Sequence, residues 1–391
     1  VYKRQDWGAR LLTTFTQNDV LVLAKRHHNT KRTYLLVNPL QAKHLPVSPS
    51  KSLEMMTCLG KQIAQKYPSA KLVIGFAETA TAIAATVAGC LDTECKYIHT
   101  TREAYSDLAN WVYFSEEHSH AVEQKLYTKD LAEWISESPQ IIFVDDEIST
   151  GKTLLNIIDQ LRETFPEAKK KQIVAASIIN RLSPEHEARF RNAGIASEFL
   201  VKVSNTDLTS AVAQFEIRPA ELVVSAGTAY EENTIHTQEP LMNPRLGVDI
   251  SKYIDNCKTV AESAMAKISE LIAPASSILV LGTEECMYPA LILGRELEKQ
   301  FPTISVKCHA TTRSPIGICS DLSYPIHLGY KIHSFYDDVR ETFIYNLDCY
   351  DIVIVLTDTC SNDLQARADI SQALRTKGCL KILFVEGGCR V

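Results

Sequence analysis

Apolar residues between positions 71 and 180 fall into short continuous runs, separated by segments with helical spacing. The runs are rich in β-branched and aromatic residues and do not alternate with polar ones, which is typical of strands buried on both faces. Strands separated by helices predict an α/β fold, with a parallel sheet covered by helices on both faces. The expected strands are 71–76, 97–101, 141–146 and 173–180, and the expected helices are 79–91 and 154–165.

The third of these strands carries charge at its carboxyl end, where ligands of parallel sheets bind. It ends in Asp145 and Asp146, and a turn around Gly151 then leads into the next helix. Adjacent carboxylates can accept two hydrogen bonds from a vicinal diol or hold a hydrated divalent cation. The backbone N–H groups of the turn and of the helix N-terminus suit a phosphate. A diol beside a monophosphate describes ribose 5-phosphate, so the sequence predicts a phosphoribosyl ligand.

The stretch FVDDEISTGKT (143–153) resembles the phosphoribosyl-pyrophosphate (PRPP) signature of type I phosphoribosyltransferases. The resemblance implies their fold, with Asp145 and Asp146 orienting the ribose hydroxyls and holding Mg²⁺ through water. A Walker A loop would need glycine five positions before Gly151, where Asp146 stands, so an ATPase is a weak alternative. The residues predicted to bind ribose 5-phosphate are Asp145, Asp146, Glu147, Ser149, Thr150, Gly151, Lys152 and Thr153.

Two further segments fit the same resemblance. Residues 75–81 join a strand to a helix where these enzymes bind pyrophosphate through backbone N–H groups, and the 106–127 insertion stands where they have a closing lid. Arg102 is expected to offset the charge of the leaving group, and an ordinary surface arginine is the alternative. The predicted pyrophosphate-binding residues are Ala77, Glu78, Thr79, Ala80, Thr81 and Arg102, and the predicted catalytic residues are Asp145, Asp146 and Arg102.

Residues that would recognise the acceptor are less clearly marked. The segment EEHSHA (116–121) suits metal ligation, proton transfer or acceptor recognition, and equally a solvated helix start. Enzymes of this family place a variable hood ahead of the sheet to select the acceptor, and solvated surface residues are the alternative there. The candidates for the lid or the acceptor site are Glu117, His118, His120, Lys43 and His44.

The second half of the chain extends the resemblance. TTRSP (311–315) is the sequence that names the TRSP domain, which follows an orotate-phosphoribosyltransferase-like domain in proteins of bacterial tellurite-resistance and stress gene clusters. HTTRE (99–103) and the 116–121 segment also look like that family, so the resemblance covers nearly the whole chain. It implies a role in making a nucleoside-like metabolite, and it does not identify the acceptor.

The two halves also resemble each other. LVIGFAETATAIAA (72–85) is echoed by LVLGTEECMYPALI (279–292), HTTR by ATTR at an offset of 313 − 102 = 211, and 141–154 by 352–364. These echoes predict a second, degenerate copy of the α/β unit, and chance similarity of short β-runs is the alternative. In this copy Asp358 replaces the acidic pair and Asp363 stands in the phosphate turn, so loss of PRPP binding is expected. Residues there that suit another ligand are Glu284, Arg313 and Ser314.

Length and composition set the remaining limits. The 391 residues suggest two domains, which we place at 1–214 and 250–391 with a proline-containing connection at 215–249. A net charge of −6 argues against a nucleic-acid or membrane-surface partner. The eleven cysteines form no C-x-x-C pair, and no apolar run reaches the length of a membrane span, about 18 residues, so a cytoplasmic location is expected.

The function that these features favour is Mg²⁺-dependent transfer of a 5-phosphoribosyl group between PRPP and a nucleobase-like acceptor. A non-catalytic PRPP sensor with the same fold is the alternative, and it predicts a basic surface or a nucleic-acid module. The long lid segment and the intact donor motif favour catalysis. The expected partners are PRPP and a nucleobase-like small molecule, and a homodimer is compatible with the sequence.

Overall fold

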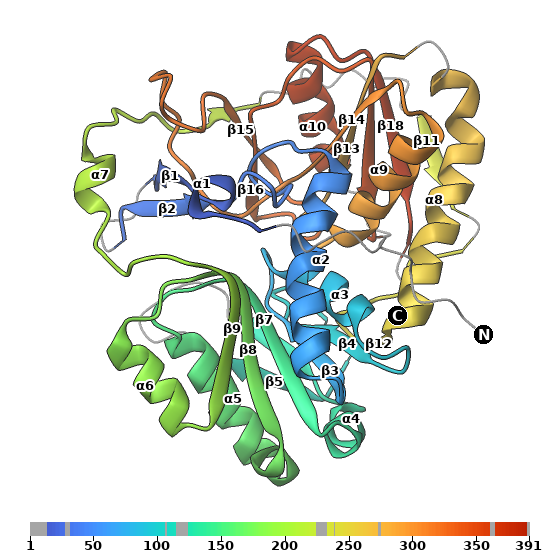
Figure 1. The fold of residues 1–391 in the computed structure, drawn as a ribbon. Coiled ribbons are helices and arrows are strands. Elements are labelled where there is room, and N and C mark those ends of the chain that lie inside the picture. The colour runs from blue at the N-terminus through green and yellow to red at the C-terminus, as the bar shows by residue number, and fades with distance from the viewer. Residues whose placement is uncertain are drawn as a thin grey trace.

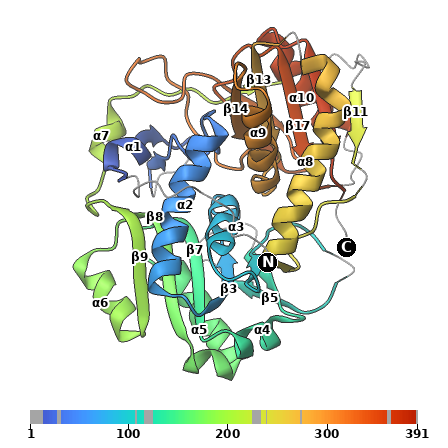
Figure 2. The same cartoon turned by 45° about the vertical axis from the view of Figure 1, so that its right-hand side comes forward.

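The computed structural model describes residues 14–27, 32–105, 108–114, 124–223, 233–237, 239–272, 275–359 and 364–388. They contain two α/β units, each built around one largely parallel sheet (Figure 1). We call residues 49–202 the first unit and residues 250–386 the second unit. The first occupies the lower half of Figure 1 and the second the upper right, with helices of both units between the two sheets (Figure 2).

The first sheet has its polar strand ends at the edge that faces the second unit. Its strands are β3 (Ala70–Gly75), β4 (Lys96–His99), β7 (Gln140–Ile148), β8 (Gln172–Asn180), β9 (Ile195–Lys202) and the short edge strand β12 (Val248–Asp249). The strand order is β12-β4-β3-β7-β8-β9, and only β12 is antiparallel to its neighbour. The expected parallel sheet is therefore present.

Helices cover both faces of this sheet, as the continuous apolar strands require. On β7, Ile142 and Val144 pack toward one set of helices, while Ile141 and Phe143 pack toward the other. The first set is α2 (Pro49–Lys66) and α3 (Thr81–Cys90), and the second is α4 (Leu131–Glu137) and α5 (Lys152–Thr164). The 3₁₀ helix η1 (Pro166–Lys170) and helix α6 (Pro184–Asn192) complete the unit.

The second sheet repeats the order of the four central strands of the first. Its strands are β13 (Ser277–Gly282), β14 (Ser305–Ala310), β17 (Ile352–Thr357), β18 (Lys381–Glu386) and the edge strand β11 (Asn233–His236). The order is β11-β18-β17-β13-β14, and all the pairs are parallel. Helices α8 (Ile250–Ile272) and α9 (Tyr288–Gln300) cover one face, and α10 (Leu364–Thr376) lies on the other.

One hydrophobic core joins the two units. Helices α2 and α3 of the first unit pack against α8 and α9 of the second, and their apolar side chains form a single cluster with the inner faces of both sheets. The 215–249 segment is tied to both units, because β11 joins the second sheet and β12 the first. None of the helices in the described ranges is both long and apolar enough to cross a membrane.

Smaller elements surround this framework. Each unit carries an antiparallel hairpin at the same place in the chain. In the first unit β5–β6 lies between β4 and β7, and in the second β15–β16 lies between β14 and β17. The N-terminal hairpin β1–β2 lies above the carboxyl end of the first sheet in Figure 1. The bounds are α1 (Gln17–Val20), β1 (Val22–Lys25), β2 (Tyr34–Val37), β5 (Trp111–Phe114), β6 (Gln124–Tyr127), α7 (Thr209–Ala213), β10 (Glu221–Leu222), β15 (Gly329–His333) and β16 (Glu341–Tyr345).

Two expectations need adjustment. Strand β7 does not end at Asp146 but continues to Ile148, because β8 still pairs with it there through Asn180. The acidic pair is therefore within the strand, beyond the point where β3 stops pairing at Val144. Of the expected lid, residues 108–114 and 124–127 are described and contain the β5–β6 hairpin, while the 116–121 segment with Glu117, His118 and His120 lies outside the described residues.

Candidate active site

The acidic pair lies on β7, at the edge of the sheet where β3 has already ended. Asp145 and Asp146 are partly buried, and the backbone N–H of Asp146 donates to Asp145 Oδ1 at 2.9 Å. Burial raises the pKa of Asp145 well above its ordinary value, and the adjacent charge of Asp146 raises it further. A carboxyl pair in this state is stabilised by a cation or by hydroxyl donors.

The turn after β7 has the backbone that an anion site requires. Gly151 is at φ +68°, in the left-handed region, and is the N-cap of α5. Lys152 and Thr153 begin the helix and are exposed. Among the described residues, none accepts a hydrogen bond from the backbone N–H groups of Thr150, Gly151 or Thr153. The turn therefore presents N–H groups and a helix N-terminus beside the acidic pair.

The loop between β3 and α3 lies on the other side of the acidic pair. Thr79 Oγ1 donates to Asp146 Oδ1 at 2.8 Å, which fixes the loop against β7. The Ala77 N–H donates to Thr100 Oγ1 at 2.9 Å, and Ala80 is the N-cap of α3, which begins at Thr81. Within the described part of the chain, the N–H groups of Glu78 and Thr79 have no acceptor. Two sets of unpaired N–H groups thus flank one pair of carboxylates.

The side chain of Glu78 does not face a ligand position. It is 6% exposed and pairs with Lys43, which precedes the first unit, and with Arg313 of the second unit. Burial alone would raise the pKa of Glu78, but the Lys43 and Arg313 charges outweigh it and leave the pKa below its ordinary value. The loop can therefore offer only its backbone to pyrophosphate.

Lys43 and His44 are not placed as acceptor-site residues. Lys43 is fully buried, and its Nζ donates to the backbone oxygens of Glu284 and Thr311 at 2.8 and 2.9 Å besides pairing with Glu78. His44 is 3% exposed, and burial together with the Lys43 charge lowers its pKa to about 3. Both residues are buried, and Lys43 contacts the second unit, so neither side chain is open to solvent where an acceptor would enter.

Glu147 also departs from its expected role. Its carboxylate pairs with Arg32 at 2.8 Å and with the fully buried Arg181 at 3.4 Å, and Arg181 donates to the hydroxyl of Tyr34 on β2 at 3.2 Å. A paired carboxylate contributes no ligand to a phosphate, and its pairing removes a charge that would repel one. Glu147 therefore joins the N-terminal hairpin to the sheet, close to the acidic pair.

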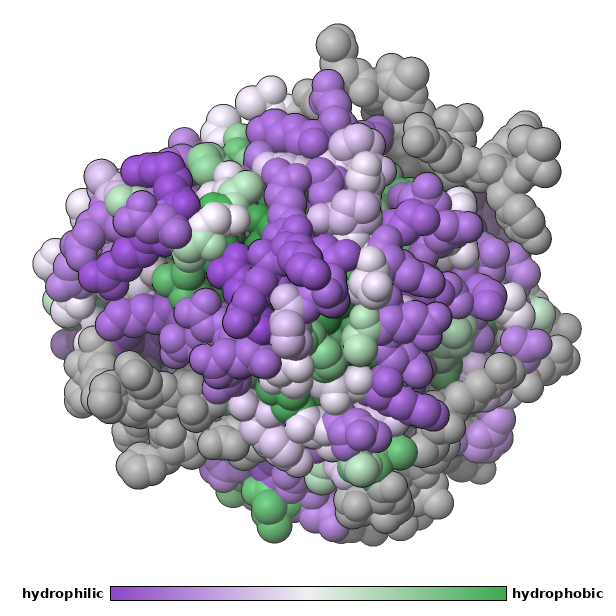
Figure 3. All heavy atoms as spheres, turned by 90° about the horizontal axis from the view of Figure 1, so that it is seen from below, coloured by the Kyte–Doolittle hydropathy of each residue, from purple (hydrophilic) through white to green (hydrophobic). Residues whose placement is uncertain are grey.

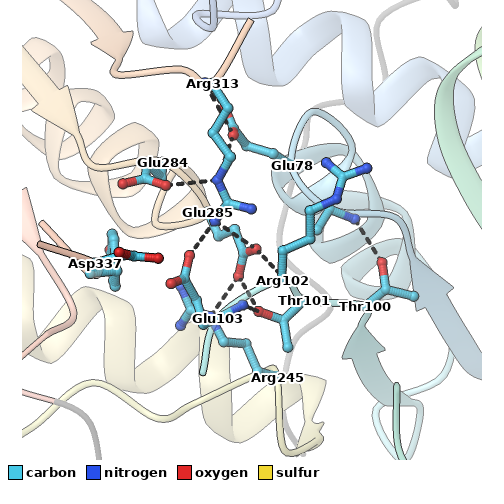
Figure 4. Close-up of polar contacts among 12 residues, drawn as sticks. Glu78, Thr100, Thr101, Arg102, Glu103, Arg245, Glu284, Glu285, Arg313 and Asp337 are labelled. Carbon is cyan, nitrogen blue, oxygen red and sulfur yellow. Dashed lines mark hydrogen bonds and ion pairs between the residues drawn. The ribbon is translucent and has the colours of Figure 1, made fainter. Parts of the chain in front are cut away.

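Arg102 follows β4, where the hairpin meets the sheet. Thr101 pairs with Lys125 of β6 through two backbone hydrogen bonds of 2.9 Å, so the hairpin continues from this strand end. The Arg102 guanidinium is directed away from the charged cluster at the unit contact (Figure 4). On the hairpin, the Lys125 ammonium lies 4.5 Å from the ring centre of Trp111.

The candidates of the second unit lie in the contact with the first. Arg313 Nε donates to Glu284 at 2.8 Å and pairs with Glu78 at 3.3 Å, and Arg313 also contacts Glu103. Ser314 donates its N–H to Thr312 Oγ1 at 3.2 Å and accepts from a tyrosine hydroxyl through its backbone oxygen. The residues predicted to suit another ligand are thus paired within the protein, while residues 360–363 lie outside the described ranges.

Among the described residues, no group of three or more histidine, cysteine or carboxylate side chains forms a metal cage. The acidic pair nevertheless fits Mg²⁺, which usually keeps several waters and takes one or two carboxylates together with substrate phosphates. The raised pKa of Asp145 has the same implication, because a nearby cation would relieve the unfavourable charge.

Comparison with known proteins agrees with this arrangement. A family model described as phosphoribosyl transferase matches residues 20–211, and the model of the TRSP domain that lies C-terminal to it matches residues 242–374. The chain belongs to this phosphoribosyltransferase family. Members of such a family are pentosyltransferase enzymes. No curated protein matches the sequence.

Solved structures with weak similarity include two adenine phosphoribosyltransferases. The enzyme from Trypanosoma brucei, in complex with AMP, pyrophosphate and ribose-5-phosphate, is 13% identical, with 50% of this chain and 79% of that chain covered and a TM-score of 0.35. The enzyme from Giardia lamblia, complexed with 9-deazaadenine, is 13% identical, with 47% and 93% covered and a TM-score of 0.34.

Several residues around the site were not predicted from the sequence. Arg181, Arg245 and Glu285 are buried charged side chains whose partners come from distant parts of the chain. One signal was present: Asn-Pro occurs at 38–39 and again at 243–244, each time a few residues before a cation that pairs with a loop glutamate, Lys43 or Arg245.

Proposed function

We propose that the phosphoribosyltransferase domain transfers a 5-phosphoribosyl group from PRPP to a ring nitrogen of a nucleobase-like acceptor, or catalyses the reverse reaction. The observation that carries the proposal is the order of groups along one sheet edge. Unpaired N–H groups of residues 78–79, the carboxylates of Asp145 and Asp146, and unpaired N–H groups of residues 150, 151 and 153 follow one another. This order matches pyrophosphate, ribose diol and 5-phosphate in one PRPP molecule.

In the reaction, the bond between ribose C1 and the pyrophosphate oxygen breaks, and its electron pair leaves with pyrophosphate. A bond from the acceptor nitrogen to C1 forms, and the acceptor nitrogen loses its proton to solvent or to a basic group. The transition state has oxocarbenium character, so the carboxylates of Asp145 and Asp146 favour the positive charge that develops beside them.

The remaining residues would bind the departing pyrophosphate and exclude water from the site. The N–H groups of Glu78 and Thr79 would receive the departing pyrophosphate, and Arg102 would balance its charge. Mg²⁺, held through water by Asp145 and Asp146, would offset the pyrophosphate charge when bound. The β5–β6 hairpin would cover the site and limit hydrolysis of the donor. The product would enter the synthesis of a nucleoside-like metabolite.

Calorimetry on the full chain tests the proposal. With Mg²⁺ present, wild-type protein should bind PRPP, and the double variant Asp145→Asn/Asp146→Asn should lose this binding while its unfolding remains cooperative. Asp159→Asn is the matched control, because this exposed carboxylate of α5 is remote from the acidic pair in the strand. Equal PRPP affinity in the double variant and the wild type would refute the assignment.

The acceptor requires a second measurement. Small molecules retained by the purified protein can be identified by mass spectrometry and then supplied with PRPP, and release of pyrophosphate is the expected result. Binding of PRPP without pyrophosphate release, across all the retained compounds and common nucleobases, would instead support a PRPP sensor.

A further inference from the structure

The two units exchange backbone pairs in a reciprocal way. Ahead of the first unit, Val47 forms an antiparallel bridge with Cys308 on edge strand β14 of the second unit, with N–H to oxygen distances of 3.0 and 2.7 Å. Ahead of the second unit, Val248 pairs antiparallel with Tyr97 on edge strand β4 of the first unit. Each unit thus completes the edge of the other.

The helices between the sheets are related in the same way. Helix α2 packs on α9, and helix α3 packs on α8. At these crossings a Cβ on Gly89 would lie 2.9 Å from Ile254 Cδ1, and one on Gly294 would lie 3.2 Å from Pro49 Cγ. Each contact joins a glycine in the second helix of one unit to the first helix of the other unit. A two-fold arrangement of equivalent surfaces accounts for such reciprocity.

The strand-end loops complete the pattern. Glu78 of the first unit accepts hydrogen bonds from the Arg313 N–H, at 3.3 Å, and from the Thr312 hydroxyl. Glu285 of the second unit accepts from the Arg102 N–H, at 3.4 Å, and from the Thr101 hydroxyl, at 2.8 Å. Figure 4 shows these side chains converging from both units.

The arrangement is asymmetric at its arginines. The Arg313 guanidinium turns into the contact and pairs with Glu78, Glu103 and Glu284, whereas the Arg102 guanidinium is directed away from it (Figure 4). In the first unit, the Arg102 guanidinium therefore lies on the side of the contact where the pyrophosphate loop is (Figure 4).

In the second unit, the strand-end carboxylate that corresponds to the acidic pair is held by other side chains of the protein. Asp358 follows β17 and corresponds to Asp146 of β7. It is 5% exposed, pairs with Arg245 and accepts a hydrogen bond from the Tyr336 hydroxyl. The position of the ribose carboxylate is thus occupied by contacts within the protein.

From this asymmetry we propose that the second unit is a built-in partner subunit of the first, in which Arg313 positions the pyrophosphate loop by holding Glu78. The proposal rests on the proposed function. The chain is then an internal dimer of two copies of one α/β unit, one copy retaining the donor site and the other supplying the charges that fix it.

The physical role of Arg313 follows from the loop itself. The N–H groups of Glu78 and Thr79 can bind pyrophosphate only if the loop backbone holds one conformation, and the Glu78 side chain is anchored by Lys43 and Arg313. Without Arg313, the Glu78 carboxylate loses one of its two cations while remaining buried. The 5-phosphate turn at 150–153 has no contact with Arg313, so the two ends of PRPP should respond differently.

The test compares two ligands on the full chain, PRPP with Mg²⁺ and ribose 5-phosphate alone. Arg313→Met should weaken PRPP binding about tenfold, which corresponds to about 1.4 kcal/mol, and leave ribose 5-phosphate affinity within about twofold. Arg340→Met is the matched control. Arg340 is 15% exposed against 13% for Arg313, and it pairs with Glu103 and Glu284 but not with Glu78. It should change neither affinity.

The outcomes separate the two proposals. If wild-type protein binds neither ligand, the proposed function fails. If wild-type protein binds both, and folded Arg313→Met binds PRPP as well as wild type or weakens both ligands equally, the positioning role fails. Arg313→Lys keeps one cation without the planar fork, and it replaces the Met variant if that does not fold. An intermediate loss for PRPP alone supports the role, and unchanged PRPP affinity refutes it.

Discussion

Replacing Gly151 by alanine is the sharpest perturbation of the phosphate turn. The residue has φ +68°, which costs an alanine about 1 kcal/mol. In addition, a Cβ there would lie 2.2 and 2.4 Å from two ring carbons of Phe190, which is 1% exposed. Ordinary carbon contacts are near 3.5–4 Å, so the ring or the turn must move by more than about 1 Å. Overpacking of this kind costs about 1–3 kcal/mol, and the sum is about 2–4 kcal/mol.

The chain contains its own control for the backbone part of this cost. Gly194 is at φ +70°, and a Cβ there meets nothing within 4 Å. Gly194→Ala should therefore lose only about 1 kcal/mol. The difference between the two variants in urea-induced unfolding measures the overlap with Phe190, and we expect it to be about 1–3 kcal/mol.

Ligand binding should follow the same displacement. Because the N–H groups of residues 150–153 move with Gly151, ribose 5-phosphate affinity should fall at least about tenfold in Gly151→Ala and stay unchanged in Gly194→Ala. Adding Phe190→Leu, which removes the overlapping ring carbons, should restore part of both stability and affinity. If Gly151→Ala is no less stable than Gly194→Ala, the overlap with Phe190 is wrong. If Gly151→Ala binds ribose 5-phosphate normally, the anion is not bound at this turn.

Three further predictions concern charge. Asp145→Asn should bind PRPP poorly yet leave the melting temperature equal or higher, because burial and Asp146 hold the pKa of Asp145 above its ordinary value; a lower melting temperature would show that the carboxylate is well compensated. Burial and the Glu285 charge raise the pKa of Glu103 to about 7, so the folded protein keeps a proton that the unfolded chain loses near pH 4.5. The free energy of unfolding should therefore fall by up to about 3 kcal/mol as the pH rises between these two values. Glu103→Gln should lack this pH dependence when urea unfolding midpoints of the wild type and the variant are compared across that range. Burial lowers the pKa values of His44, His99 and His309 to about 3, 4 and 4. Below about pH 6.5 the unfolded chain binds protons that the folded protein does not, so the free energy of unfolding should fall as the pH falls. In urea unfolding measured against pH, His309→Gln should show a smaller loss of stability on the acid side.

The sequence predicted what local patterns determine. Continuous apolar runs correctly predicted the central strands and the parallel sheet, because strands buried on both faces leave a periodicity that is visible residue by residue. The boundary of β7 was wrong by two residues, since pairing with β8 through Asn180 extends it, and a partner strand is not visible in a local pattern. The signature 143–153 also led to the turn with its left-handed glycine.

The sequence did not predict which charged side chains pair with residues far away in the chain. Lys43 looked like a solvated or acceptor-facing residue because nothing near it in the chain indicates that Glu78 and the backbone of Thr311 enclose it. Likewise Glu147 belongs to the matched signature, yet its charge is balanced by Arg32 and Arg181 from the two ends of the first half. Long-range ion pairs of this kind depend on tertiary contacts, which a single sequence does not reveal.

The two units differ in how the carboxylates at the corresponding strand end are paired. In the first, Asp145 and Asp146 form no ion pair with a described side chain, and burial together with the Asp146 charge raises the pKa of Asp145. In the second, the corresponding Asp358 is paired with Arg245 and accepts from Tyr336. A site that must receive a diol and a cation has to leave its carboxylates uncompensated, which reduces stability. The second unit has no such requirement and instead contributes paired charges, among them Arg313 on Glu78, that hold the first unit's loop in place. The second unit therefore differs from the first at two places: its strand-end carboxylate is paired with Arg245, and its Arg313 pairs with Glu78 of the first unit.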